Sequence, residues 1–147
     1  MANYSTEFCV SLGHCTDAHW TWLNQEYDRT HEAYLPDPAT GKQVVNPDYD
    51  DDANSFALSK HDGKVVIFSE DASDPEEVAN LIQAFLKKFH PTRWVVLQCA
   101  FVCDKHRPDG FGGSVCVITA EEQHWQSTNA WADEKVTELQ LAADKKL

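Results

Sequence analysis

Positive charge is what this sequence most lacks: 12 Lys and Arg residues stand against 24 Asp and Glu residues, for a formal net charge of −12. This excess of negative charge repels phosphate backbones and argues against broad binding to a nucleic-acid duplex. It favours a basic protein partner, including one that normally grips phosphates with Lys and Arg, because complementary charge speeds encounter. Solubility alone would also explain the charge, and net charge does not decide between these readings.

Long apolar runs are missing too. No stretch approaches the roughly 18 apolar residues of a membrane span, and residues 1–8 lack the pattern of a signal peptide. The five cysteines are an odd number and cannot all pair within one chain, which favours reduced thiols. We therefore expect a cytoplasmic protein without membrane contact.

A catalytic signature, an internal repeat and a low-complexity tract are also absent, so we expect a non-enzymatic protein. What is present is apolar material: 42% hydrophobic and 11% aromatic residues argue for a packed fold and against an acidic disordered tail. Residues 1–147 fit one α+β domain, large enough to bury roughly 68–70% of its unfolded surface.

The first half of the chain predicts a strand, a helix, a long loop and a hairpin. Alternating apolar residues predict a strand over 7–12, and a cap at Thr16 and Asp17 starts a helix over 17–30. Residues 31–54 are rich in Pro, Asp, Gly and Asn and predict a long acidic loop. The Asp62-Gly63 pair between two apolar runs predicts a β-hairpin, because Gly tolerates positive φ.

The second half opens with a helix and two strands. Asp74 and Pro75 supply an N-cap and a proline at the first helical position, and Pro91 ends the helix. Apolar runs over 94–102 and 114–119 predict two strands joined by a loop.

A last helix is predicted from one of two starts, the capping-box spacing of Thr119 and Glu122 or the polar residues 127–129. Its expected core face comprises Ala132, Val136, Leu139 and Ala143. The five Trp side chains are expected in the core. The order of elements predicts a two-layer sandwich with a mostly antiparallel sheet and helices on one face, ferredoxin-like (split βαβ) with additions.

The sharpest cluster of negative charge falls in the long loop, where Asp48, Asp50, Asp51 and Asp52 surround Tyr49. Carboxylates can replace phosphates as partners of Lys and Arg, while an aromatic residue supplies apolar contact. We expect this segment to bind a basic partner protein, as an inhibitor of a nucleic-acid-binding protein would.

Cysteine and histidine offer an alternative. Cys99, Cys103, His106 and Cys116 are of the ligand types that Zn²⁺ selects, and they indicate a zinc-binding or thiol-dependent protein. The spacing is unlike a zinc knuckle, and within an apolar strand Cys99 is more simply a small buried hydrophobe. Zinc is the one cofactor that the sequence suggests.

The loop between the predicted strands over 94–102 and 114–119 carries the densest basic cluster of the chain. Lys105, His106 and Arg107 precede Gly112 and Gly113, and exposed backbone N–H groups there could hold an anion. The pattern is neither a P-loop nor a dinucleotide fingerprint, because it leads into a strand where those motifs lead into a helix.

A reactive thiol is a further hypothesis at the start of the first helix. Cys15 stands between His14 and His19, and a helix N-terminus lowers the pKa of a thiol. The alternative is that these are capping residues around a packed thiol.

Residues 94–131 contain the turn Cys-Asp-Lys-His-Arg-Pro-Asp-Gly-Phe-Gly-Gly, the close Val-Ile-Thr-Ala and the later Trp-Gln-Ser-Thr-Asn-Ala-Trp. In these motifs the chain resembles small uncharacterised proteins of phages and mobile genetic elements. The resemblance covers about a quarter of the chain. It implies a genomic setting in which an immunity protein or a counter-defence inhibitor would fit, and it carries over no residue roles.

Overall fold

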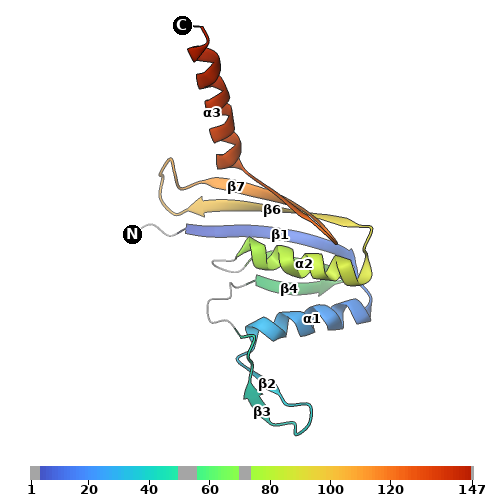
Figure 1. Ribbon diagram of the computed structural model, residues 1–147. Helices are drawn as coiled ribbons and strands as arrows, with labels where there is room; N and C mark the ends of the chain where they lie inside the picture. Colours follow the sequence, from blue (N-terminus) through green and yellow to red (C-terminus); the bar gives the residue numbers. More distant parts are fainter. Residues whose placement is uncertain (1–3, 50–55, 70–73, 147) are drawn as a thin grey trace.

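The computed structural model describes residues 4–49, 56–69 and 74–146, which form an α+β fold (Figure 1). Six antiparallel strands make one sheet in the order β4-β5-β1-β6-β7-β8, and β2 and β3 form a separate two-stranded ribbon. The elements are β1 (Tyr4–His14), α1 (Asp17–His31), β2 (Tyr34–Pro36), β3 (Gln43–Val45), β4 (Phe56–His61), β5 (Lys64–Ser69), α2 (Pro75–Phe89), β6 (Trp94–Cys103), β7 (Gly112–Thr119), β8 (Gln123–Ser127) and α3 (Thr128–Asp144).

Strand β1 joins two halves of the sheet. Its first half, residues 4–8, pairs with β6, whereas residues 9–14 pair with β5. The pairing with β5 slips by one residue between Ser11 and Gly13, and Gly13 has a φ of +74°, a conformation that favours glycine. β1 is longer than the predicted strand because both of its ends find partners.

Two local signals are confirmed. Asp62 and Gly63 turn β4 into β5 with φ values of 50° and 77°, the two positive angles of a tight hairpin turn. Asp74 caps α2, since its carboxylate accepts a hydrogen bond from the backbone N–H of Glu76 at 3.0 Å, and Pro75 occupies the first turn.

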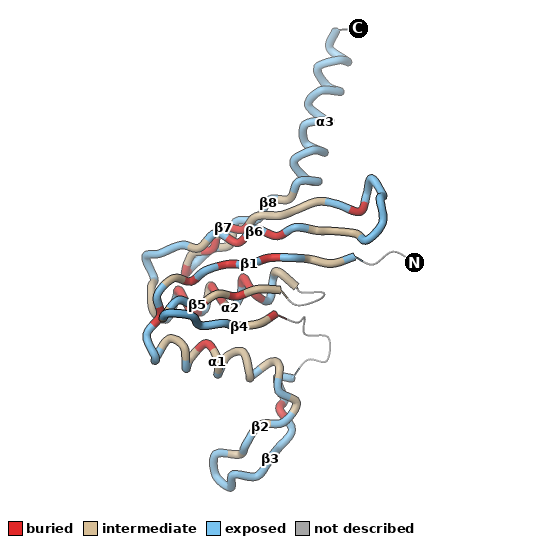
Figure 2. Tube along the Cα trace, turned by 180° about the vertical axis from the view of Figure 1, so that it is seen from behind, coloured by how far each residue is buried: buried red, intermediate tan, exposed pale blue. Residues whose placement is uncertain are grey.

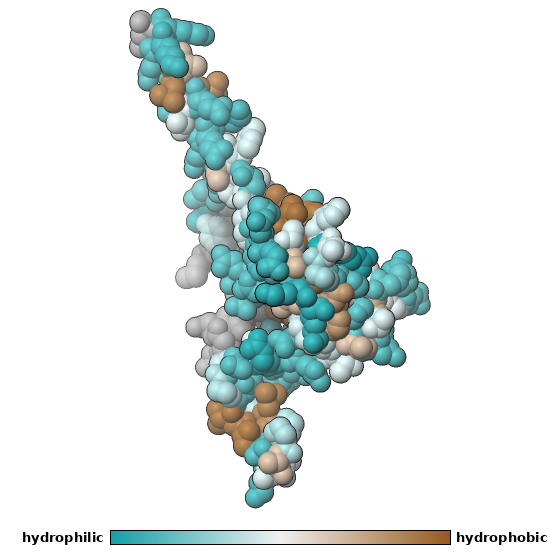
Figure 3. Space-filling view, turned by 45° about the vertical axis from the view of Figure 1, so that its right-hand side comes forward, coloured by the Kyte–Doolittle hydropathy of each residue, from teal (hydrophilic) through white to brown (hydrophobic). Residues whose placement is uncertain are grey.

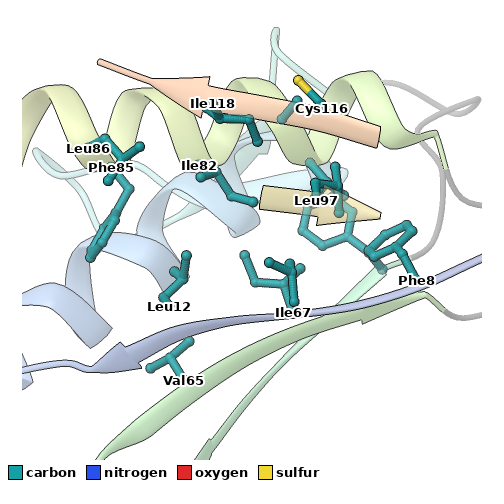
Figure 4. Close-up of a cluster of buried hydrophobic side chains, with 14 of the residues drawn as sticks. Phe8, Leu12, Val65, Ile67, Ile82, Phe85, Leu86, Leu97, Cys116 and Ile118 are labelled. Atoms are coloured by element: carbon teal, nitrogen blue, oxygen red, sulfur yellow. The ribbon is translucent and has the colours of Figure 1, made fainter. Parts of the chain in front are cut away.

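Alternate side chains of the sheet form the core with α1 and α2, which cover the same face (Figures 1 and 2). Figure 4 shows side chains from β1, β5, β6, β7 and α2 converging on this space. Ile82, Leu97 and Ile118 are fully buried there, and each such side chain contributes about 1.5–3 kcal/mol by leaving water. This layer gives the fold its stability.

The opposite face of the sheet is open. Trp94 and Val96 of β6 are exposed on it, and Val115 and Val117 of the paired strand β7 are half-buried beside them. The expectation that Trp94 lies in the core is wrong, because in the alternation of the strand Trp94 shares the outer face with Val96, while Leu97 and Cys99 face the core. The sheet therefore presents a partly apolar face to solvent.

The long loop predicted over 31–54 contains the ribbon of β2 and β3, so the view of it as structureless is wrong within residues 34–45. The predicted helix start at Thr119 is also wrong. The Thr119 hydroxyl accepts the N–H of Glu122 at 2.9 Å, but this bond closes the turn from β7 into β8. The second predicted start is confirmed, because Ser127 caps α3 by accepting the N–H of Ala130 at 3.1 Å.

Helix α3 leaves the body and projects away from it (Figures 1 and 2). None of its 17 residues is buried. The predicted core face of Ala132, Val136, Leu139 and Ala143 is therefore exposed, and that prediction is wrong for this chain on its own. Trp131 is also exposed, and so is Trp125 of β8, whereas Trp20 and Trp22 pack against the core.

Candidate functional site

The ribbon of β2 and β3 is the part of the predicted acidic loop that the structure orders. Tyr34 pairs with Val45 and Pro36 with Gln43 across the two strands. At the tip, the carboxylate of Asp37 accepts the N–H of Ala39 at 2.9 Å, and Asp37 N–H binds the carbonyl of Lys42 at 2.8 Å. These local bonds close the turn, as an Asx turn does.

A buried asparagine fixes the ribbon to the body. Asn46 is 4% exposed, and its amide donates to the backbone carbonyls of Arg29 at 2.6 Å and Glu32 at 2.8 Å. These carbonyls stand at the C-terminal end of α1, where a helix has no internal donors for them. The Asn46 Oδ1 atom accepts the N–H of Asp48 at 3.0 Å, so one side chain joins helix, ribbon and acidic segment.

The ribbon presents apolar side chains to solvent. Tyr34 and Val45 lie directly opposite each other and are 60% and 72% exposed, and Val44 and Tyr49 are exposed as well. We call Tyr34, Val44, Val45 and Tyr49 the hairpin surface, in which Val44 lies on the other face of the ribbon from Tyr34 and Val45. Apolar residues colour the lower end of the molecule in Figure 3, over this ribbon. Such a protruding aromatic and β-branched patch is typical of a protein interface.

The charge beside the hairpin surface is only partly compensated. A carboxylate oxygen of Asp48 lies 3.6 Å from Nη1 of Arg29, and both side chains are half exposed. Arg29 also binds Glu26 at 3.2 Å. A solvent-exposed pair of this kind contributes about 0–1 kcal/mol, so Asp48 can exchange Arg29 for another cation. Asp50, Asp51 and Asp52 lie outside the described residues.

The residues of the zinc hypothesis are not brought together as a ligand set. Cys99 and Cys116 are buried in the core on neighbouring strands, and burial raises the pKa of both thiols. His106 is exposed in the loop after β6, and Cys103 is half-buried at its start. Within the described residues, no three His, Cys, Asp or Glu side chains are placed to hold a metal ion.

The glycines of the anion hypothesis serve packing. The N–H of Gly113 donates to the hydroxyl of Thr128 at 3.1 Å, and a Cβ atom there would lie 3.0 Å from the carbonyl oxygen of Cys99. Gly112 lies in β7 beside it, while Lys105, His106 and Arg107 are exposed. In the described residues, no cluster of backbone N–H groups therefore lies beside these basic side chains to form the predicted anion site.

The start of α1 follows the capping alternative. The Thr16 hydroxyl accepts the N–H of His19 at 3.2 Å, and the His19 ring accepts the N–H of Thr16 at 3.1 Å. Cys15 is buried, and burial raises the pKa of its thiol more than Lys60 and Arg93 lower it. The reactive-thiol hypothesis required a lowered pKa for Cys15 and is therefore wrong, because burial favours the neutral thiol.

Two hollows were not expected from the sequence, although Cys99 and Gly113 of the predicted sites line the second of them. One, of about 470 Å³, separates residues 9–13 of β1 from residues 94–96 of β6, where the pairing of these strands has ended, and His90 and Arg93 border it. The other, of about 630 Å³ and mostly apolar, lies at the foot of α3. Sequence periodicity places residues on faces but does not reveal where paired strands diverge.

No family model, curated protein or solved structure matches this chain. Among residues 4–49, 56–69 and 74–146, no helix combines the length and the apolar character needed to cross a membrane.

Proposed function

We propose that this protein is a non-enzymatic inhibitor that occupies the basic site of a partner protein. The hairpin surface supplies the apolar contact and residues 48–52 supply the carboxylates. In this proposal the partner is a nucleic-acid-binding protein, and the carboxylates take the place of phosphates against its Lys and Arg side chains. The resemblance of residues 94–131 to proteins of phages and mobile elements favours such an antagonist.

The observation that carries the proposal is the exposed pair of Tyr34 and Val45 on a ribbon that Asn46 holds against α1. A two-stranded ribbon is marginal in water unless something fixes it. Because the ribbon is fixed before a partner arrives, less conformational entropy is lost on binding. An apolar centre flanked by charge also matches the usual anatomy of an interface.

We also propose the finer fold assignment, a ferredoxin-like split βαβ with additions. The succession β1, α1, β4, β5, α2 and β6, with β1 between β5 and β6, supports it. The β2–β3 ribbon, β8 and α3 are then the additions. The ribbon is inserted between α1 and β4, so the proposed binding surface belongs to an addition and can vary without disturbing the core.

The experiment is an affinity capture from host lysate with the immobilised full chain, followed by elution of the captured protein. We expect elution by rising salt and by a short DNA duplex, since both compete for the partner's basic site. The variant Asp50→Asn/Asp51→Asn/Asp52→Asn should bind the captured partner at least tenfold more weakly, and Val45→Ser should weaken it without reducing the salt dependence.

The matched control changes the charge equally at another place. Asp133→Asn/Glu134→Gln/Glu138→Gln on α3 also removes three negative charges and should bind like the wild type. If this variant weakens binding as much as the loop variant, net charge rather than the acidic segment is responsible. A partner that resists both salt and duplex contradicts the proposal outright.

A further inference from the structure

Helix α3 is too exposed to be explained by the single chain. It has 17 residues and none is buried, so it extends for about 26 Å at about 1.5 Å per residue with contacts only near its foot in the described chain. Isolated helices of about this length are marginal in water, because helix formation in proteins depends on packing of an apolar face. A second surface is needed to cover α3.

The apolar residues of α3 are arranged for another helix. Ala132, Val136, Leu139 and Ala143 follow one another at spacings of four, three and four residues, which is the seam of a coiled coil. We call these four residues the α3 stripe. Leu139 at its centre is 69% exposed. A stripe of this spacing on an exposed helix matches a helical partner better than a flat one.

The groove at the foot of α3 continues the stripe onto the sheet. Its floor includes Gln98 and Val115 on the open face, and its wall is formed by Trp131 and Ala132 of α3. A helix that lies along the α3 stripe would therefore bring one of its ends into an apolar groove.

We propose that the partner of α3 is a second copy of this chain, with the two α3 helices paired antiparallel about a two-fold axis. In this register Ala132 of one copy meets Ala143 of the other, and Val136 meets Leu139. The C-terminal end of each α3 enters the groove at the foot of the other. The same surface is used on both copies, as a two-fold interface requires.

Charge selects the antiparallel direction. In a parallel pair the two bodies, each part of a chain of net charge −12, would sit at the same end of the helices. The antiparallel pair holds them at opposite ends of about 26 Å of helix, beyond the Debye length of about 8 Å at physiological salt. Beside the seam, Asp133 then faces Gln140 and Lys135 faces Ala142, so no like charges oppose each other.

The area suits a reversible dimer. Half of the side of a cylinder about 26 Å long and about 10 Å across is roughly 400 Å², and this is what each copy buries on its own α3. The groove and the adjoining sheet face add further area on each copy. Each copy therefore buries at least roughly 400 Å², about half of the roughly 800 Å² per partner of a standard stable interface, as a weak and concentration-dependent dimer would.

The first test is sedimentation equilibrium of the full chain across the micromolar range. We expect a monomer of 16.6 kDa to give way to a dimer as concentration rises. Leu139→Glu should weaken the dimer at least tenfold. Leu141→Glu is the matched control, since Leu141 is 57% exposed on the other side of the same helix and should leave the dimer unchanged. A wild-type monomer at every concentration, or equal effects of both variants, overturns the proposal.

The second test reads the direction of the helices. Val136→Glu and Leu139→Lys should each be monomeric alone, because each places an unpaired charge in the seam. Mixed together they should form a dimer, since antiparallel pairing sets the new Glu against the new Lys. In a mixture of Val136→Glu with Leu141→Lys, Leu141→Lys should pair only with itself and Val136→Glu should stay monomeric, because Leu141 lies outside the seam. Failure of the first mixture to dimerise refutes the antiparallel register, and unchanged urea midpoints confirm that the body of each variant is folded.

Discussion

Removal of the Asn46 side chain should release the β2–β3 ribbon while the body stays folded. Asn46→Ala deletes three hydrogen bonds, two to the carbonyls of Arg29 and Glu32 and one from the N–H of Asp48. The side chain is buried at the root of the ribbon but is not part of the apolar core between sheet and helices. The loss is therefore expected to be local.

The magnitude follows from these contacts. Each hydrogen bond contributes about 1 kcal/mol net, so three together stabilise the closed ribbon by about 3 kcal/mol. Since 1.4 kcal/mol is a factor of ten in an equilibrium constant, opening of the ribbon should become roughly 100-fold more frequent. The freed carbonyls at the end of α1 reach water, which limits any further cost.

Hydrogen exchange measured by mass spectrometry resolves this effect. In Asn46→Ala the amides of residues 34–45 should exchange roughly 100-fold faster, while those of β6 keep their wild-type rates. Asn24→Ala is the control, because Asn24 donates to the carbonyl of Trp20 within α1 and makes no described hydrogen bond to the ribbon. Unchanged exchange in the ribbon, or equal acceleration in β6, would refute the view that Asn46 anchors the ribbon alone.

Three further predictions concern the body. Leu97→Ala, at a fully buried position, should lower the free energy of unfolding in urea by about 2–5 kcal/mol, and a loss below about 1 kcal/mol would contradict the core described here. Burial raises the pKa of Cys99 above its ordinary 9.0, so this thiol should resist a thiol reagent that modifies exposed Cys9. Folding stability should fall as pH rises above about 9, because the thiol ionises at a lower pH in the unfolded chain than in the folded one. Burial and, to a smaller extent, the charge of Arg93 lower the pKa of His90 below 6.5. Folding stability should therefore fall as pH drops below 6.5, because the unfolded chain takes up the proton first, and Arg93→Gln should raise the pKa of His90 in an NMR titration.

Elements with their own local chemistry could be predicted from the sequence. Asp62-Gly63 and Asp74-Pro75 act through backbone angles and a cap, which depend on neighbouring residues only. The Thr119 and Glu122 spacing misled for the same reason, because a threonine hydroxyl caps a turn as readily as a helix. Whether a helix or a strand follows is decided by pairing with β7, which no local pattern contains.

The sequence predicted where helices and strands lie better than it predicted which of their faces is buried. The α3 stripe has the correct spacing for burial, yet spacing does not say which surface covers it. In the candidate site, Asp48 and Tyr49 could be singled out from composition. The short β2–β3 ribbon and its buried anchor Asn46 could not, because a three-residue strand has too few positions to show a period.

The division of β1 between two partners dictates the order of events during synthesis. Residues 4–8 pair with 99–103, and residues 9–14 pair with 64–68. At about 5–20 residues per second, the strand made first waits roughly 5–20 s on the ribosome for the last of its partners. Until then residues 4–8 have no partner strand, although residues 9–14 can already pair with β5. The two halves of the sheet are therefore joined late, and a nascent chain stalled before Cys103 carries an open strand edge over residues 4–8, a ready template for pairing with another chain.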